Sequence, residues 1–283
     1  MNKRLSTTSK RRLPMDNRSA RCGVLISVRD LDELAQLRRL PIDVIDFKEP
    51  LAGPLAAVDP AVWQAAAAGK SRLRHSAASP GIRFSAALGE ADQALECVRR
   101  VPENFEFAKA GTWKMHREDE ILSLWRQIDR GLPSGVTQVG VAYADAAERG
   151  GLSASKIAKL AHRHGLRWLL VDTFSKTKQT SLDFLSDAEY QRVHETCNRH
   201  GIRWTLAGGL QRTSLARFVD AGPGSLPMPD MFAFRGAVCA NDRTGRVDVG
   251  KCRQLLDTIA SLPPLSRCIT RGRATKSSNA VAG

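Results

Sequence analysis

One pattern recurs eight times along the chain: a short apolar run, then a stretch with the three- and four-residue spacing of a helix. The apolar runs are typical of buried strands, and they occupy residues 22–28, 44–48, 82–88, 104–111, 137–143, 168–173, 203–208 and 231–236. The helical stretches cover residues 31–40, 90–100, 117–130, 153–164, 187–200, 211–220 and 249–262, with one more helix starting at Asp59-Pro60. Strands that alternate with helices over short connections form a parallel sheet.

Eight strand-and-helix units in about 240 residues have the size of a (β/α)₈ barrel. The rival architecture is an open doubly wound sheet, but no G-x-G-x-x-G turn follows the first apolar run. The pattern therefore predicts an α/β protein with a single (β/α)₈ TIM barrel, formed by residues 22–263.

The positive charge of the chain is concentrated at its two ends. Of the formal net charge of +14, residues 1–21 carry +6, from seven Lys/Arg and one Asp. Residues 264–283 carry +4, from four Lys/Arg and no acid, which leaves +4 for the body. Both ends are rich in Ser, Thr and Arg and poor in apolar residues, so we predict basic disordered tails at 1–21 and 264–283.

Bulk features favour an intracellular protein over a membrane or secreted one. No run approaches the ~18 apolar residues of a membrane span, and no apolar signal core follows the basic start. The six cysteines show no C-x-x-C and no His-paired metal spacing, which favours reduced thiols. We therefore expect a cytoplasmic protein that needs no metal and no organic cofactor, and the oligomeric state, including a homo-oligomer, stays open.

Charged residues follow three of the expected strands at their carboxyl ends. They are Asp46 and Lys48 on the second strand, Lys109 on the fourth, and Asp172 on the sixth with Lys176 in the loop beyond it. Alternate strand residues share a face, so Asp46 and Lys48 should point with Val44, and Lys109 with Phe105 and Phe107. The carboxyl ends of barrel strands form the active site, so we expect these five groups to meet there.

Clustered lysines suit carbonyl chemistry. An ordinary lysine, with a pKa near ~10.4, is almost wholly ammonium at neutral pH, whereas burial and a second cation lower the pKa and free the amine. The amine then forms an imine with an aldehyde or ketone, and the neighbouring carbon loses its proton readily. A carboxylate such as Asp46 or Asp172 can move protons and hold the ammonium forms in place.

Glycine-rich ends of the last two strands indicate a phosphate site. The seventh strand ends in Gly208-Gly209 and the eighth in Arg235-Gly236. Backbone N–H groups at such turns approach a phosphate closely, and the Arg235 guanidinium would add a fixed positive fork.

Several segments together resemble the (5-formylfuran-3-yl)methyl phosphate synthase family, which makes the furan precursor of methanofuran. They are LISV, VIDFKEPLAGPLAA, FSAALGE, FEFAKAGTW, LLVDTFSKTKQTSLDF, LAGGL and FRGAVC, and they run through nearly all of residues 22–260. The D-x-K-x-P, A-K-x-G, D-T-x-x-K and R-G-A-V-C elements occur in this order. The loop at residues 49–54 departs from the family's usual N-P-K/x-E-G-S-like pattern, and the basic ends lie outside the family pattern.

The resemblance implies a barrel lyase (EC 4.2.3.-) that condenses two molecules of glyceraldehyde 3-phosphate through a Schiff base. One phosphate and water are lost, and 4-(hydroxymethyl)-2-furancarboxaldehyde phosphate forms. In that family the lysine of D-x-K carries the imine, here Lys48, and the lysine of A-K-x-G accepts the proton, here Lys109. The resemblance also implies supporting roles for Asp46, Asp172 and Lys176.

Two other functions stay open at this level. One is a different class I aldolase-like Schiff-base barrel that acts on a sugar phosphate, because the residues by themselves define only the amine chemistry. The other is nucleic-acid binding through the basic tails, although these tails lack the interleaved aromatics of single-strand binders. A salt-dependent gel shift that compares the full chain with residues 22–263 separates the second from an enzyme.

Overall fold

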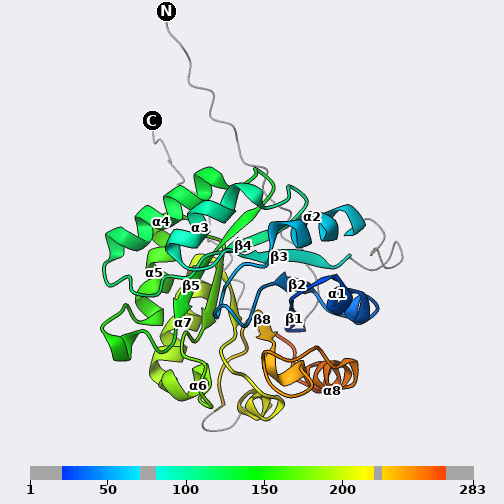
Figure 1. Ribbon diagram of the computed structural model, residues 1–283. Coiled ribbons are helices and arrows are strands. Elements are labelled where there is room, and N and C mark those ends of the chain that lie inside the picture. Colours follow the sequence, from blue (N-terminus) through cyan, green and yellow to red (C-terminus); the bar gives the residue numbers. More distant parts are fainter. Residues whose placement is uncertain (1–20, 71–80, 220–224, 266–283) are drawn as a thin grey trace, which may run out of the picture.

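The computed structural model describes residues 21–70, 81–219 and 225–265. Within them, eight parallel strands close into a barrel in the order β1 to β8 (Figure 1). The strands are β1 (Gly23–Val28), β2 (Val44–Phe47), β3 (Arg83–Ala87), β4 (Phe107–Lys109), β5 (Thr137–Tyr143), β6 (Trp168–Asp172), β7 (Arg203–Leu206) and β8 (Met231–Phe234). β1 pairs with β8 as well as with β2, which closes the barrel. The predicted (β/α)₈ barrel is confirmed.

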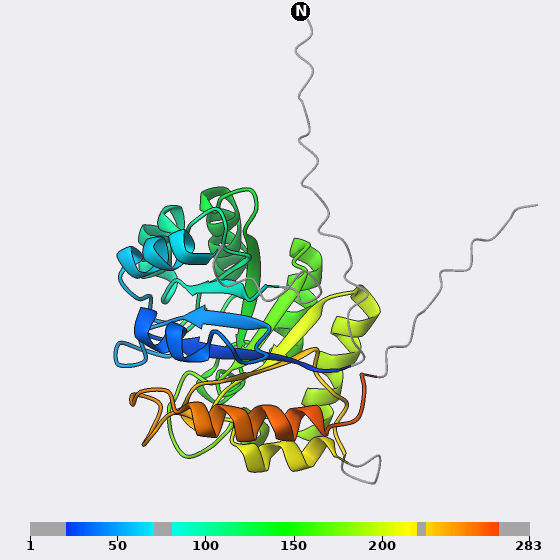
Figure 2. The ribbon, with the colours of Figure 1, turned by 90° about the vertical axis from the view of Figure 1, so that its right-hand side faces the viewer.

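Helices surround the strands and cover the outer face of the barrel (Figures 1 and 2). They are α1 (Leu31–Leu37), α2 (Pro60–Gly69), α3 (Ala91–Cys97), α4 (Glu118–Gly131), α5 (Ala154–His164), α6 (Ser181–Phe184), α7 (Asp187–His200) and α8 (Val249–Ala260). Short 3₁₀ helices are η2 (Val98–Arg100), η3 (Ala147–Arg149), η4 (Arg212–Phe218) and η5 (Gly236–Val238). The predicted tails at 1–21 and 264–283 lie, except for residues 21, 264 and 265, outside the described residues.

Local sequence signals explain where several helices begin and end. Asp59 caps α2 by accepting a hydrogen bond from the amide of Ala61, and Pro60 occupies the first helical position, as expected. Ser153 stands at the N-cap of α5, and Gly165 ends that helix in the left-handed conformation with a φ of 84°. Caps of this kind set the short connections that keep each helix against its own strand.

The alternation of strand residues separates two cores. One lies between strands and helices and contains the outward-facing residues, such as Val24 and Ile26 of β1. The other fills the barrel and contains the inward-facing ones, such as Leu25 and Val44. Since Val44 points inward, Asp46 two residues later also points into the barrel.

The structure corrects two details of the sequence prediction. The fourth strand begins at Phe107, so Phe105 lies before it and packs in the outer core against Phe47 and Phe84, away from the face of Lys109. The seventh helix is the 3₁₀ helix η4, whose buried residues Leu215 and Phe218 are three apart, the repeat of a 3₁₀ turn.

Candidate active site at the mouth of the barrel

Lys109 and Asp46 form a buried ion pair inside the barrel. Lys109, the last residue of β4, is 3% exposed, and Asp46 of β2 is 1% exposed. The Lys109 amine donates to the Asp46 carboxylate and, at 3.1 Å, to the hydroxyl of Ser85 on β3. The other carboxylate oxygen of Asp46 accepts from Ser27 on β1 at 3.2 Å. Four neighbouring strands thus contribute to one polar layer in which a proton can pass between amine and carboxylate.

Lys48 follows β2 directly and, unlike Lys109, has an amine without a carboxylate partner among the described residues. Among the described residues, no hydrogen bond or ion pair engages its amine. Burial lowers the pKa of Lys48 from 10.5 to about 8; the negative charge of Asp172 opposes this, and the positive charge of Lys176 adds to it. Weaker effects come from Asp46, whose negative charge raises the pKa of Lys48, and from Lys109, whose positive charge lowers it. A usable fraction of the Lys48 amine is therefore free near neutral pH.

Asp172 and Lys176 form a second pair, beside Lys48. The Lys176 amine donates to the Asp172 carboxylate at 3.0 Å and also to the backbone carbonyl of Thr173. Burial by itself raises the pKa of Asp172, but Lys176, Lys48 and the amide of Thr173 outweigh it, so the pKa is lowered. Asp172 therefore stays ionised at neutral pH and lies close enough to Lys48 to influence its charge.

The loops after β7 and β8 present free backbone amides. The N–H groups of Gly208, Gly209 and Gly236 have no hydrogen-bond acceptor within the described part of the chain. Gly208 has a φ of +86°, and a Cβ there would lie 2.9 Å from the amide nitrogen of Thr173. Only glycine fits this close approach of two loops. The two turns thus offer backbone donors, and their binding of a phosphate stays a prediction.

Arg235 has other partners than the expected phosphate. Its Nη1 donates to the Ser27 carbonyl at 3.1 Å and to Glu33 at 2.5 Å. Its Nη2 donates to Glu33 at 3.1 Å and to the Gly245 carbonyl at 2.6 Å, and its Nε to the Arg243 carbonyl at 3.0 Å. All five N–H donors are used, so Arg235 ties β1, α1 and the loop after β8 together and has none left for a ligand.

A second arginine in the same loop, Arg243, has fewer hydrogen-bond partners than Arg235. Arg243 is half-buried, and its Nη2 donates to the Gly53 carbonyl in the loop after β2 at 3.0 Å. No other hydrogen bond joins its guanidinium to the described residues. Burial lowers the pKa of Arg243, and the negative charge of Asp172 opposes this. The sequence prediction missed this residue because it lies eight positions beyond the strand-end pair.

An acid and three aromatic rings line the mouth above β4 and β5. The hydroxyl of Tyr143, the last residue of β5, donates to Glu90 at 2.5 Å, and the Trp113 amide donates to the same carboxylate at 2.9 Å. The ring of Trp113 stacks on Phe174, with centroids 3.8 Å apart, and both meet Tyr143 edge-on. The strand-end search missed Glu90, although it stands in the segment FSAALGE just past the third strand.

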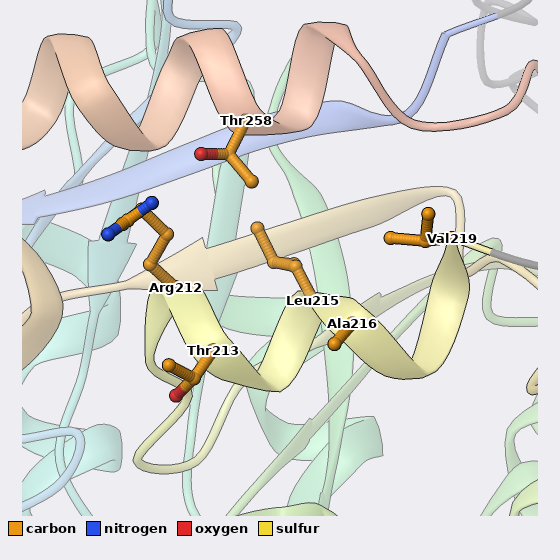
Figure 3. Close-up of a pocket in the computed structure, with 6 residues that line it drawn as sticks. All are labelled: Arg212, Thr213, Leu215, Ala216, Val219 and Thr258. Atoms are coloured by element: carbon orange, nitrogen blue, oxygen red, sulfur yellow. The ribbon is translucent and has the colours of Figure 1, made fainter.

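A separate hollow lies outside the barrel, between η4 and α8 (Figure 3). It is lined by Arg212, Thr213, Leu215, Ala216, Val219 and Thr258. Its lining is largely apolar and brings together none of the lysines or carboxylates of the mouth. This hollow is therefore separate from the charged groups at the carboxyl ends of the strands.

The described residues show neither a metal-binding cluster nor a membrane-crossing helix. The described residues hold no group of three or more His, Cys, Asp and Glu side chains placed to bind a metal ion. Of the helices in the described ranges, none combines the length and apolar character of a membrane-crossing segment.

A closed (β/α)₈ barrel with lysines and aspartates gathered at the carboxyl ends of its strands has the construction of a barrel enzyme. The sequence matches the family described as 4-HFC-P synthase over residues 24–256, and the chain belongs to this family. A curated relative, the (5-formylfuran-3-yl)methyl phosphate synthase of Methanothermobacter thermautotrophicus, is 25% identical over 247 residues, which cover 84% of this chain and 99% of the relative. The enzyme of the same name from Methanosarcina barkeri is 24% identical, over 79% of this chain and 93% of its own.

Solved structures support the fold alone. The putative copper homeostasis protein CutC from Streptococcus agalactiae superposes with a TM-score of 0.53 at 12% identity, over 75% of this chain and 97% of its own. A rubisco-like protein from Burkholderia fungorum gives a TM-score of 0.52 at 16% identity, over 87% of this chain and 61% of its own.

Proposed function

We propose that this protein is a Schiff-base lyase that condenses two molecules of glyceraldehyde 3-phosphate to 4-(hydroxymethyl)-2-furancarboxaldehyde phosphate. The observation that carries the proposal is Lys48, a lysine without an ion-pair partner among the described residues and with a pKa lowered to about 8. Membership of the 4-HFC-P synthase family agrees with this chemistry. We place the reaction in the cytoplasm, where triose phosphates are formed.

In the proposed reaction, the free amine of Lys48 attacks the aldehyde carbon, and water leaves as the imine forms. Lys109 first passes one of its own protons to Asp46, with which it is hydrogen-bonded, and its free amine then accepts the carbon-bound proton next to the imine. The resulting enamine attacks the second aldehyde. Asp172 and Lys176 support Lys48, because their opposite charges hold its amine in place without pairing it.

The substrate phosphates bind, in this proposal, at the loops after β7 and β8. The free amides of Gly208, Gly209 and Gly236 are the backbone donors, and Arg243 supplies the positive charge. Arg235 does not bind the phosphate in this proposal, because all its N–H donors are occupied; it holds the loop after β8 against β1 and α1.

Borohydride trapping tests the imine. Reduction in the presence of glyceraldehyde 3-phosphate should leave a stable adduct on the peptide that contains Lys48, and Lys48→Arg should give neither adduct nor turnover, because a guanidinium cannot form the imine. An adduct solely on Lys109 or Lys176 would refute the assignment.

Product analysis separates the furan synthase from another aldolase-like barrel. With glyceraldehyde 3-phosphate as the sole substrate, a furan aldehyde absorbs in the near ultraviolet, whereas a ketose phosphate does not. A ketose phosphate as the main product would favour the alternative aldolase reaction.

A further inference from the structure

Glu90 occupies a position that the proposed chemistry has not yet used. It lies three residues after β3, and its carboxylate accepts from Tyr143 at the end of β5. The strand between them is β4, whose last residue is Lys109. The contact between Glu90 and Tyr143 therefore crosses over the strand that carries the proposed proton acceptor.

Two hydrogen bonds and a close backbone approach fix the carboxylate of Glu90 in place. The Trp113 amide donates to one oxygen at 2.9 Å while the Tyr143 hydroxyl donates to the other at 2.5 Å. The chain passes beneath the carboxylate at Gly111, and a Cβ there would overlap both carboxylate oxygens. Gly111 in turn donates its amide to the Gly89 carbonyl at 2.9 Å, which fixes the two loops against each other.

Burial favours the acid form of the Glu90 carboxyl group. Burial raises the pKa of Glu90, and the two hydrogen bonds from Tyr143 and Trp113 lower it without reversing the shift. The charge of Asp172 adds to the rise and that of Lys176 opposes it, so Glu90 shares the mouth with the second ion pair. A raised pKa leaves a larger fraction of this carboxyl group protonated than in an exposed glutamate, which favours a role as proton donor.

We propose that Glu90 is the general acid that protonates the leaving hydroxyl group when the condensed intermediate loses water. The proposal rests on the proposed furan synthesis, which requires a dehydration after the two trioses are joined. Two neighbouring carboxylates already have lysine partners: Asp46 is paired with Lys109 and Asp172 with Lys176.

The step balances without an oxidant. Lys109 takes the proton from the carbon next to the imine, and the electron pair of that C–H bond becomes the new C=C bond. The C–O bond on the adjacent carbon breaks, its electron pair stays on oxygen, and the oxygen takes the proton of Glu90 to leave as water. Glu90 regains a proton from the solvent at the mouth, where its side chain is half-buried.

Glu90→Gln is the decisive variant, with Glu96→Gln, on the exposed face of α3, as the matched control. The amide oxygen of glutamine can still accept from the Trp113 amide, and its NH2 group can donate to the Tyr143 hydroxyl, but the side chain has no acidic proton. We expect imine trapping on Lys48 and exchange of the carbon-bound proton at the wild-type rate, furan formation lowered about 100-fold or more, and a build-up of the undehydrated six-carbon adduct. Glu96→Gln should behave as wild type in all three measurements.

Each other outcome overturns the proposal in a recognisable way. Furan formation at the wild-type rate in Glu90→Gln removes Glu90 from the reaction while the proposed function stands. Loss of imine trapping or of exchange in the same variant shows that Glu90 acts before dehydration. If the wild-type protein traps an imine on Lys48 but forms no furan aldehyde, the proposed function fails and the assigned step fails with it.

Discussion

The lowered pKa of Lys48 predicts a distinct pH profile for its reactivity. At pH 7 a group with a pKa of about 8 is roughly 9% free amine, whereas an ordinary lysine with a pKa near ~10.4 is about 0.04% free amine, a difference of roughly 200-fold. The shift has this sign because burial and the neighbouring positive charges of Lys176 and Lys109 disfavour the charged form more than Asp172 and Asp46 favour it. Labelling of Lys48 should therefore rise about tenfold per pH unit below pH 8 and level off above it.

Competitive labelling of the unliganded protein measures this directly. Trace amounts of an amine-acylating reagent are added from pH 6 to pH 11, and the modified peptides are quantified by mass spectrometry. Lys178, exposed in the loop after β6, provides an internal reference within the same sample. A Lys48 profile that keeps rising to pH 10 in parallel with that of Lys178 would refute the electrostatic argument, whatever the activity of the enzyme.

Three further substitutions test the rest of the site. Lys109→Ala should still form the trapped imine on Lys48 but should lose exchange of the substrate's carbon-bound proton with deuterated water, because the proposed acceptor is gone. Arg243→Ala should weaken binding of glyceraldehyde 3-phosphate by about 1.5–3 kcal/mol, seen as a higher Michaelis constant, because a charged hydrogen bond is lost. Glu33→Gln should lower the free energy of unfolding by about 3–5 kcal/mol in urea denaturation, because it leaves the buried guanidinium of Arg235 without its counter-charge.

Control substitutions at exposed positions separate these effects on binding and stability from non-specific effects of mutation. Arg253→Ala removes an exposed arginine of α8 and should leave the Michaelis constant unchanged. Asp32→Asn neutralises an exposed acid next to Glu33 and should change the free energy of unfolding by less than about 0.5 kcal/mol. Exchange at the normal rate in Lys109→Ala would make Asp46 or Asp172 the first candidate for the base.

The fold could be predicted because its signal repeats. Each strand is apolar on both faces and each helix on one, so eight alternating segments indicate the barrel even where a single boundary is wrong. The boundaries that were wrong lie where local turns compete with the strand pattern. Phe105 continues the apolar alternation of the fourth strand, but its amide donates to the Pro102 carbonyl at 3.0 Å in a turn, so pairing begins at Phe107.

The partners of charged side chains could not be predicted, because they come from distant parts of the chain. Arg235 stands in a typical phosphate-binding position, yet Glu33, on a helix more than two hundred residues earlier, occupies its guanidinium. Glu33 looks like an ordinary acid in the first turn of a helix, and no local pattern marks it as buried. Arg243 and Glu90 were missed for the converse reason, since loop residues gain their place at the mouth only from the fold.

In the proposed reaction, the arrangement of partners, rather than the amount of charge, selects the reactive lysine. Lys109 and Lys176 each face a carboxylate at hydrogen-bond distance, so both positive charges are compensated where they stand. The charges of both pairs act on the pKa of Lys48, whose amine has no direct partner in the described chain. A substrate phosphate adds negative charge to the mouth, which by itself would favour the ammonium form of Lys48 and slow the attack. In the proposed reaction, the guanidinium of Arg243 neutralises part of the phosphate's negative charge. The phosphate site thereby also preserves the free amine of Lys48, on which imine formation depends.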